Sequence, residues 1–234
     1  MSDIAYYDQN DRSFARQLRT MAPQEFQAYR GFSDVAVGRK DGVIPPRYRE
    51  LIAIAVGLTT QCAYCIETHT AKARGLGVSP AELAETIYIA AALRAGAAAA
   101  HGMMAMKLYE HAADDKAGTP VNYHESSDRT FAQQLRKAAP AEFAAYRNFS
   151  DVAVGRQDGS IEPKYRELIA VAVGLTTQCA YCLETHTAKA RKLGVSPEEL
   201  AETVYIAAAL RAGAAAAHGM MALKLYQNAA PAAN

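Results

Sequence analysis

The sequence lacks an excess of charge of either sign. Its 25 Lys and Arg side chains are balanced by 24 Asp and Glu, which gives a formal net charge of +1 at pH 7. Binding to nucleic acid or another polyanion needs a basic stripe, so the composition gives no support for such a partner. Low net charge also removes one barrier to self-association. Half of the 234 residues are hydrophobic, which is enough for a sizeable core.

Cysteines outside two short motifs are also missing. All four cysteines stand in two Cys-x-x-Cys pairs, so none is left for the disulfide framework of a small secreted protein. Residues 1–17 are polar and charged and lack the apolar core of a signal peptide. The longest uncharged run, residues 51–66, falls short of the roughly 18 apolar residues of a membrane span. We therefore expect a soluble, cytoplasmic protein without membrane contact.

The second half of the sequence repeats the first almost residue for residue. Cys62 matches Cys179 at an offset of 179 − 62 = 117, and the same offset holds without a gap over most of each half. A period of this length predicts two whole domains, residues 1–113 and 128–234, and not a solenoid. Residues 114–127 are polar and break the repeat, so we interpret them as a linker.

The local signals in each repeat are helical, and no alternating Val, Ile and Thr pattern of a strand occurs. Pro23 and Pro46 each open a segment with apolar residues at mostly helical spacings. Thr59 or Thr60 can cap the next helix, which holds the cysteines. The expected fold class is therefore all-α, with two tandem helical domains related by duplication.

Long Ala-rich stretches follow the cysteine segment. Ser79 and Glu82 fit a capping box with a proline at the first helical position, which marks the start of this region. We expect a break near Gly96, which would divide the region into two helices. The small side chains allow close packing between helices.

The residues that carry chemistry in the first repeat lie at positions 62–69. Cys62 and Cys65 are three residues apart on a helix, and His69, four residues after Cys65, shares their face. Glu50 lies on the preceding helix, and a helix hairpin could fold its carboxylate back toward the imidazole. The second repeat carries the equivalent set: Glu167, Cys179, Cys182 and His186.

Thiol redox chemistry accounts for this combination of residue types. The thiolate is the reactive form, and a free cysteine titrates near ~8.5. A neighbouring histidine can take the thiol proton, and a carboxylate behind it can orient the imidazole. The second thiol can trap a sulfenic acid as a disulfide. A helix N-terminus would favour Cys62 as the attacking residue, whereas the histidine one turn away favours Cys65, which we prefer because a direct base should matter more.

With Glu50, the cysteine pair and His69 in this order, the first repeat resembles the AhpD-like alkylhydroperoxidases of the carboxymuconolactone decarboxylase superfamily. The second repeat resembles them equally, and the likeness covers most of each repeat. It implies an all-helical fold and a Glu–His–water relay that activates the second cysteine of each pair, which then forms a disulfide with the first. It also implies homo-oligomers, here most simply a trimer of two-domain chains. Tyr64 and Tyr181 stand where some members have a histidine between the cysteines.

By this likeness, Glu50 and His69 serve Cys65, while Glu167 and His186 serve Cys182. We therefore predict an enzyme: a thiol-dependent peroxidase or disulfide oxidoreductase that reduces hydroperoxides at two sites per chain. It would need no bound cofactor and no metal. Its partners would be a small peroxide or disulfide substrate and an external dithiol or protein reductant.

Two other interpretations stay open. The cysteine pair with His69 supplies three possible zinc ligands, so each repeat could be a non-enzymatic metal-binding or redox-sensing module. Zinc modules usually bring a second ligand pair in a loop, which is missing here. The second interpretation is an enzyme of the decarboxylase type that acts on a lactone or small organic acid. Family members that decarboxylate muconolactone, however, typically lack the cysteine pair. Haem attachment is excluded in its usual form, because no histidine directly follows the second cysteine.

Four further residues are candidates for the pocket. Tyr64 and Tyr181 either line it or simply pack. His101 and His218 lie in the Ala-rich stretches and could reach the site, although a hydrogen-bonded packing role is the preferred prediction. His111 and His124 have no histidine at the matching position of the other repeat and look incidental.

Overall fold

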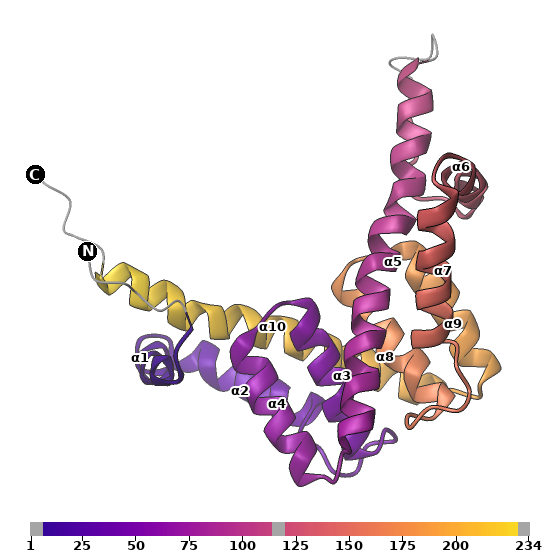
Figure 1. Cartoon of the computed structure of the whole chain (residues 1–234). Coiled ribbons are helices and arrows are strands. Elements are labelled where there is room, and N and C mark those ends of the chain that lie inside the picture. Colours follow the sequence, from indigo (N-terminus) through magenta and orange to yellow (C-terminus); the bar gives the residue numbers. More distant parts are fainter. Residues whose placement is uncertain (1–6, 114–119, 229–234) are drawn as a thin grey trace, which may run out of the picture.

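The computed structural model describes residues 7–113 and 120–228, and within these ranges it contains ten α-helices, two short 3-10 helices and no strand (Figure 1). This confirms the all-α expectation. Residues 1–6 of the N-terminal segment and 114–119 of the expected linker lie outside the described residues, as do residues 229–234. The first repeat contains η1 (Gln9–Asp11), α1 (Arg12–Met21), α2 (Pro23–Ala36), α3 (Pro46–Thr59), α4 (Ala63–Gly75) and α5 (Pro80–Ala113). The second contains η2 (Ser126–Thr130), α6 (Phe131–Ala138), α7 (Pro140–Ala153), α8 (Pro163–Thr176), α9 (Ala180–Lys192) and α10 (Pro197–Asn228).

Local sequence signals set where several of these helices begin. Proline is the first residue of α2, α3 and α5 and of their counterparts in the second repeat. Its missing N–H is harmless there, because the first N–H groups of a helix have no partner in the helix. The expected capping box is also present: the Ser79 N–H donates to the Glu82 carboxylate at 2.9 Å, and the Glu82 N–H donates to Ser79 Oγ at 3.2 Å.

The cap expected from Thr59 or Thr60 is wrong. Both hydroxyls instead donate to carbonyl groups of their own helix, α3, about one turn back. The N-cap of α4 is Cys62, whose Sγ accepts a hydrogen bond from the Cys65 N–H at 3.2 Å. Gln61, with a positive φ of 56°, makes the tight reversal between α3 and α4. Cys62 is therefore both the N-cap of α4 and a residue of the predicted redox site.

The expected break at Gly96 is also wrong, because α5 is continuous from Pro80 to Ala113. Gly96 is needed for packing: a Cβ added there would lie 2.6 Å from the Tyr146 hydroxyl oxygen. Gly213 in α10 accommodates Tyr29 in the same way, at 2.5 Å. A glycine inside a helix can thus allow a neighbouring side chain to approach closely, and it need not end the helix.

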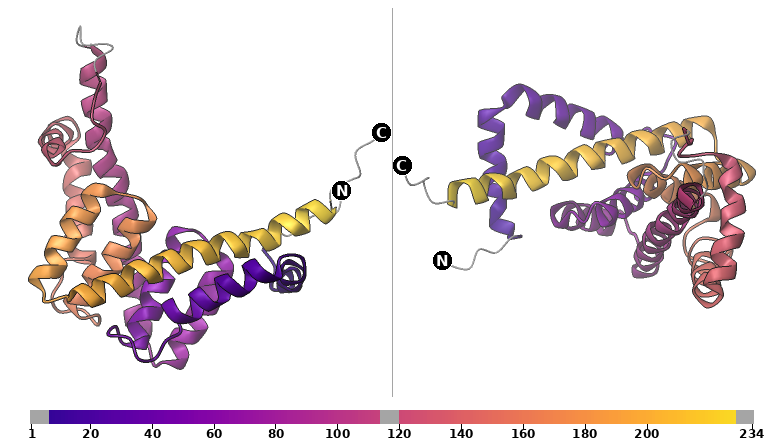
Figure 2. Two further views of the ribbon diagram at one scale, coloured as in Figure 1. Left: turned by 180° about the vertical axis from the view of Figure 1, so that it is seen from behind. Right: turned by 90° about the horizontal axis from the view of Figure 1, so that it is seen from above.

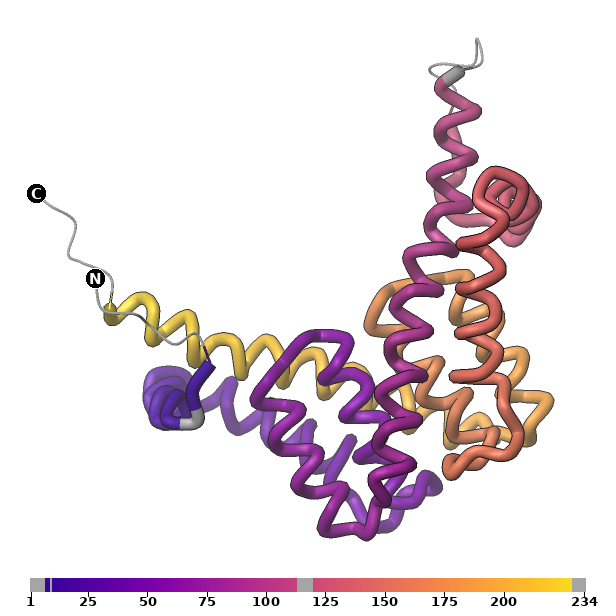
Figure 3. Tube along the Cα trace, viewed as in Figure 1, coloured from indigo at the N-terminus to yellow at the C-terminus, as the bar shows by residue number. Residues whose placement is uncertain are grey.

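The two long helices cross from one repeat to the other (Figure 1). Helix α5 packs on α3 of its own repeat and then on α6, α7, α8 and α9 of the second. Helix α10 does the reverse and packs on α8 and then on α1, α2, α3 and α4 of the first (Figure 2). Both extend outward from the shared centre, and the tube in Figure 3 shows each beside helices of the other repeat. Each helical bundle is thus completed by a helix from the other repeat.

Buried ion pairs join the exchanged helices to their hosts. The fully buried Arg49 guanidinium donates to two carbonyl groups of its own repeat and pairs with Glu202 on α10. Glu202 also accepts the N–H groups of Val43 and Ile44, at 3.0 and 2.9 Å. The second repeat has the same arrangement around Arg166 and Glu85. The helix exchange is therefore specified by charge as well as by apolar packing.

The core centres on α3 and α8, which pack against each other. The rings of Tyr48 and Tyr165 stack at the contact with their centroids 3.6 Å apart. By length and composition, α5 and α10 are apolar enough to cross a membrane. In this structure each lies against helices of both repeats, and 39% of the most apolar window of each is buried.

Candidate active site

The hairpin of α3 and α4 brings the first repeat's carboxylate and imidazole together. Glu50 Oε2 lies 2.6 Å from His69 Nδ1, and both side chains are largely buried. In the second repeat, α8 and α9 place Glu167 Oε2 and His186 Nδ1 at the same 2.6 Å. A carboxylate only accepts, so the contact places a proton on Nδ1, and in the neutral form of the ring Nε2 is the base.

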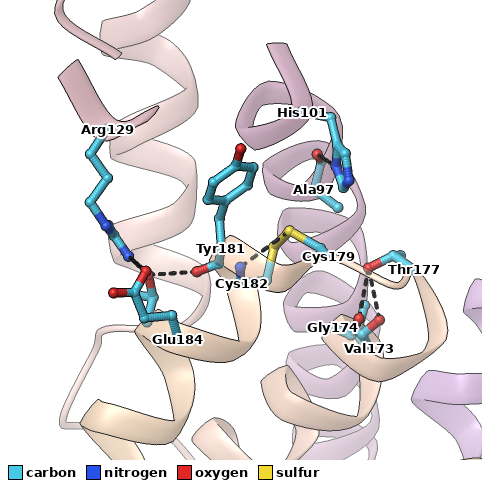
Figure 4. Close-up of a disulfide and its surroundings, with 11 residues drawn as sticks. Ala97, His101, Arg129, Val173, Gly174, Thr177, Cys179, Tyr181, Cys182 and Glu184 are labelled. Atoms are coloured by element: carbon cyan, nitrogen blue, oxygen red, sulfur yellow. Dashed lines mark hydrogen bonds and ion pairs between the residues drawn. A yellow bond between two sulfur atoms is a disulfide. The ribbon is translucent and has the colours of Figure 1, made fainter. Parts of the chain in front are cut away.

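The two cysteines of each repeat are joined in a disulfide, Cys62–Cys65 in the first and Cys179–Cys182 in the second. Figure 4 shows the second of these. The members of a pair differ in access. Cys62 is completely buried, whereas Cys65 is 8% exposed and lines a pocket together with His69. In the second repeat Cys182 takes the place of Cys65. A substrate in the pocket therefore meets Cys65 or Cys182 first.

The pocket beside Cys65 has a volume of about 250 Å³ and is built by both repeats. Helices α1, α2 and α4 of the first repeat form part of its wall, and α10 of the second closes it. The residues that α10 contributes are Ala209, Leu210, Gly213, Ala217 and Met220. The site of the first repeat is therefore incomplete without the second.

The pocket beside Cys182 is the counterpart, with walls from α6, α7 and α9 and a closing face from α5. Its volume is also about 250 Å³. The α5 residues Ala92, Leu93, Gly96, Ala100 and Met103 match those of α10 at the offset of 117. Both sites thus offer the same side chains to a substrate.

The rim of the first pocket is polar and its closing wall apolar. Arg12, Arg30 and Lys72 line it together with Tyr29. The Arg12 guanidinium is held by Glu67 at 2.7 Å. Because the α10 wall is Ala, Leu and Met, the pocket suits a small molecule with an apolar part and a polar reacting group.

Tyr64 lines the pocket, and its hydroxyl donates to the buried Asp11 carboxylate at 2.5 Å. Asp11 also accepts from Lys224 Nζ on α10, at 2.7 Å. Burial and the Asp11 carboxylate raise the pKa of Tyr64, so its hydroxyl stays protonated. Burial alone would raise the pKa of Asp11, but the hydrogen bonds from Lys224 and Tyr64 outweigh it and lower that pKa.

The second site has the same network, in which Tyr181 donates to Asp128 and Asp128 pairs with Lys107. Burial, followed by the Asp128 carboxylate, raises the pKa of Tyr181 to about 12. Sequence reasoning missed these aspartates and lysines. The only available signal was that Asp11 and Asp128 occupy matching positions. The repeat does not show that a helix from the other half of the chain buries these carboxylates.

His101 and His218, possible pocket residues from the sequence, are not among the side chains that line the two cysteine pockets. Each Nδ1–H donates to a carbonyl one turn back on its own helix, at 2.8 Å. His101 lies on the side of the Cys179–Cys182 disulfide away from Arg129 (Figure 4). His124, treated as incidental above, packs with its ring centroid 5.5 Å from those of both His101 and Tyr181.

A metal site was the alternative interpretation of the cysteine motif. Over residues 7–113 and 120–228, no group of three or more His, Cys, Asp and Glu side chains is arranged to hold a metal ion. The cysteines are paired with each other, and the histidine of each motif is engaged by a carboxylate. The arrangement is that of a disulfide beside an acid–imidazole pair.

Comparison with known proteins adds two relatives of matching sequence. A protein of Paracoccus denitrificans described as uncharacterized protein 4 in the cox locus is 46% identical over 66 residues, which are 28% of this chain and 60% of that protein. An uncharacterized protein of Cupriavidus necator is 33% identical over 92 residues, which are 39% of this chain and 80% of that protein. The first match thus spans less than two thirds of the relative.

A solved structure from Burkholderia xenovorans, provisionally described as a gamma-carboxymuconolactone decarboxylase subunit, has the same fold. The TM-score is 0.70 at 20% identity, and the match covers 92% of this chain and 90% of the other. The model of the carboxymuconolactone decarboxylase family matches residues 23–108 and again residues 140–225. Because these two matches together cover most of the sequence, the chain belongs to the carboxymuconolactone decarboxylase family, with one family domain in each repeat.

Proposed function

We propose that this chain is a thiol-dependent peroxidase or disulfide oxidoreductase with two active sites. The family includes both peroxidase and decarboxylase members, so the residues of the site must distinguish between them. The observation that carries the proposal is the Glu–His contact of 2.6 Å beside a paired-cysteine centre, present in both repeats. A decarboxylase would have no evident use for the cysteine pair.

In the proposed reaction, the reduced first site begins with two thiols. His69 Nε2 takes the Cys65 proton while Glu50 holds Nδ1–H and stabilises the imidazolium. The Cys65 thiolate attacks the distal hydroperoxide oxygen, and the alcohol leaves with a proton from the imidazolium. The Cys62 thiol then attacks the sulfenic acid, so that the disulfide and one water form. The hydroperoxide gains two electrons and the thiol pair loses them.

An external dithiol, free or carried by a protein, would return the disulfide to two thiols and complete the cycle. We also propose that the chain assembles as a trimer, six family domains in all. The mass in solution, measured by light scattering on the full chain, tests this assembly. A monomer or a dimer across the working concentration range would contradict it.

The decisive experiment is peroxide consumption with dithiothreitol as the reductant. We expect the parent chain to consume an organic hydroperoxide catalytically and the double variant C65S/C182S to lose that activity. The single variants C65S and C182S each leave one intact site, so each should retain part of the rate. Equal rates for the parent and the double variant would refute the proposal.

Two further measurements separate the alternatives. About one tightly held zinc ion per repeat, in protein purified without oxygen, would favour a metal-binding module. Turnover of a lactone or small organic acid that survives removal of all four cysteines would favour the decarboxylase type. Under our proposal, both results are negative.

A further inference from the structure

The Glu–His pair serves only one side of each disulfide. Cys182 borders the pocket beside His186, whereas Cys179 is completely buried and caps α9. Cys179 must nevertheless lose a proton when the disulfide forms and regain one when it is reduced. A buried sulfur cannot exchange that proton directly with water, and a buried thiolate with few polar contacts is costly. Proton transfer at Cys179 therefore needs a route other than direct exchange with water.

His101, supplied by α5 of the other repeat, lies on this side of the disulfide (Figure 4). Ala97, one turn before it, belongs to the same buried cluster as Cys179 and Tyr181. The His101 ring lies edge-on to that of Tyr181, with centroids 6.1 Å apart. His101 is only partly buried, so its ring can exchange a proton with solvent. Because its Nδ1–H donates to the Ala97 carbonyl, Nε2 of the neutral ring is left as the proton acceptor.

We propose that His101 is the proton-transfer group for Cys179. The inference rests on the proposed function for its redox chemistry. During oxidation, Cys179 gives its proton to the imidazole and its sulfur attacks the sulfenic acid of Cys182. The S–S bond forms as the S–O bond breaks, and the departing hydroxide takes the proton from the imidazolium and leaves as water. During reduction, an external thiolate attacks Cys182, the Cys179 thiolate leaves, and the imidazolium protonates it.

His218 on α10 is the counterpart of His101 at the offset of 117, but its neighbours are different, so the two sites differ. On the His218 side, the Tyr7 hydroxyl lies 3.3 Å from His218 Nε2, and the Tyr7 ring packs near Tyr64. Arg94 and Arg211 share a cavity with His218.

In the second site, the residue that matches Tyr7 at the offset of 117 is His124, whose ring is edge-on to His101. The other polar groups near this pair are Tyr181 and, behind it, Asp128 with Lys107. Imidazole changes its charge between pH 5 and 8. Reduction of the second disulfide should therefore depend more steeply on pH than reduction of the first.

The test follows reduction of one disulfide at a time. In the full chain carrying C62S/C65S, only the second site can form a disulfide, and its reduction by excess dithiothreitol is timed by thiol labelling and mass spectrometry from pH 5.5 to 8.5. We expect H101Q, which keeps an amide donor for the Ala97 carbonyl, to slow reduction by about tenfold below pH 7 and to flatten the pH profile. H124Y should give the second site the profile of the first.

The matched control is H218Q in the same C62S/C65S chain, because His218 is the counterpart of His101 at the offset of 117 but lies beside Tyr7, on the side of the first site. It should leave the rate and the pH profile unchanged. The proposal is overturned if H101Q matches its parent, or if H101Q and H218Q slow reduction equally at every pH, which would indicate a general loss of packing. The assay uses no peroxide. The role of His101 could therefore be supported even if the chain proved not to be a peroxidase, and a peroxidase activity could be found even if His101 had no role.

Discussion

The contact between Glu50 and His69 is the smallest unit on which the proposed chemistry depends. The carboxylate fixes the ring so that Nε2 is the base, and it stabilises the charge that follows proton uptake. The same pair in the second repeat allows each site to be studied in a chain whose other site is silent. At the scale of single residues, the proposed activity depends on the hydrogen bond between Glu50 and His69 and on the burial of both side chains.

Replacing Glu50 with Gln in a chain that carries C179S/C182S should slow oxidation of the first site by about ten- to a hundredfold, because the amide can bond the ring but cannot stabilise the imidazolium. The measurement is the rate of Cys62–Cys65 disulfide formation after a hydroperoxide pulse. E110Q is a control and should leave the rate unchanged, since Glu110 is exposed on α5 and is not among the residues that line the pocket. An unchanged rate in E50Q would remove Glu50 from the mechanism.

The buried Asp11 and Asp128 carboxylates should make the fold sensitive to acid. Hydrogen bonds from Lys224 and Tyr64, and from Lys107 and Tyr181, outweigh burial and hold both pKa values below the ordinary 3.8. A lowered pKa contributes stability that is complete above the unfolded-state value and is lost as the pH falls through the folded-state value.

The free energy of unfolding, measured by urea from pH 7 to pH 2, should therefore fall at the acid end. The variant D11N/D128N should be less stable than the parent at pH 7 but approach it as the acids protonate. A constant difference between the two proteins across this range would show that the carboxylates do not act through their charge.

Among the elements, α5 and α10 decide the architecture, since each belongs to one repeat by sequence and completes the other by packing. Carboxylates on these two helices form ion pairs with fully buried guanidinium groups and hold the helices in place. Glu202 compensates Arg49 and also holds the loop through Val43 and Ile44. A buried charge that loses its partner is strongly destabilising.

Changing Glu202 to Gln should lower the free energy of unfolding by about 3–5 kcal/mol, because it leaves the Arg49 guanidinium buried without a counter-charge. E198Q, a few residues earlier on α10 and exposed, is the matched control and should change little. Urea unfolding of both variants beside the parent provides the comparison. If E202Q were as stable as E198Q, charge would not hold the exchanged helix in place.

For the molecule as a whole, the exchange means that the chain is built like a dimer whose halves have been joined. The residues that α5 presents to the second site match those that α10 presents to the first. A single repeat therefore carries both halves of the contact, although it cannot pair them within itself.

A fragment of residues 1–117 should accordingly form a homodimer, in which the α5 of one copy takes the place of α10 in the other. Sedimentation equilibrium should give twice the fragment mass, and E85Q in the fragment should weaken the dimer because Glu85 pairs with Arg166 in the full chain, the counterpart of Arg49. A stable, folded monomer of the fragment would contradict the need for exchange.

Much of this molecule could be predicted from local patterns. The period of 117 residues predicted two equivalent sites, the prolines and the Ser79–Glu82 box marked helix starts, and the spacing of Cys65 and His69 placed them on one face. These features depend on residues a few positions apart, whose relation a helix fixes. The catalytic roles assigned to them stay predictions until the experiments above are done.

Only the tertiary structure decided which helix closes which site. Local sequence patterns do not show which repeat a long helix completes, because the two copies offer nearly identical surfaces. The same ambiguity hid the roles of Gly96, Asp11 and His124, whose partners lie on the other repeat or far along the chain. Sequence fixes local geometry through short-range backbone and side-chain preferences. The choice between equivalent partners depends on the free energy of the whole assembled chain.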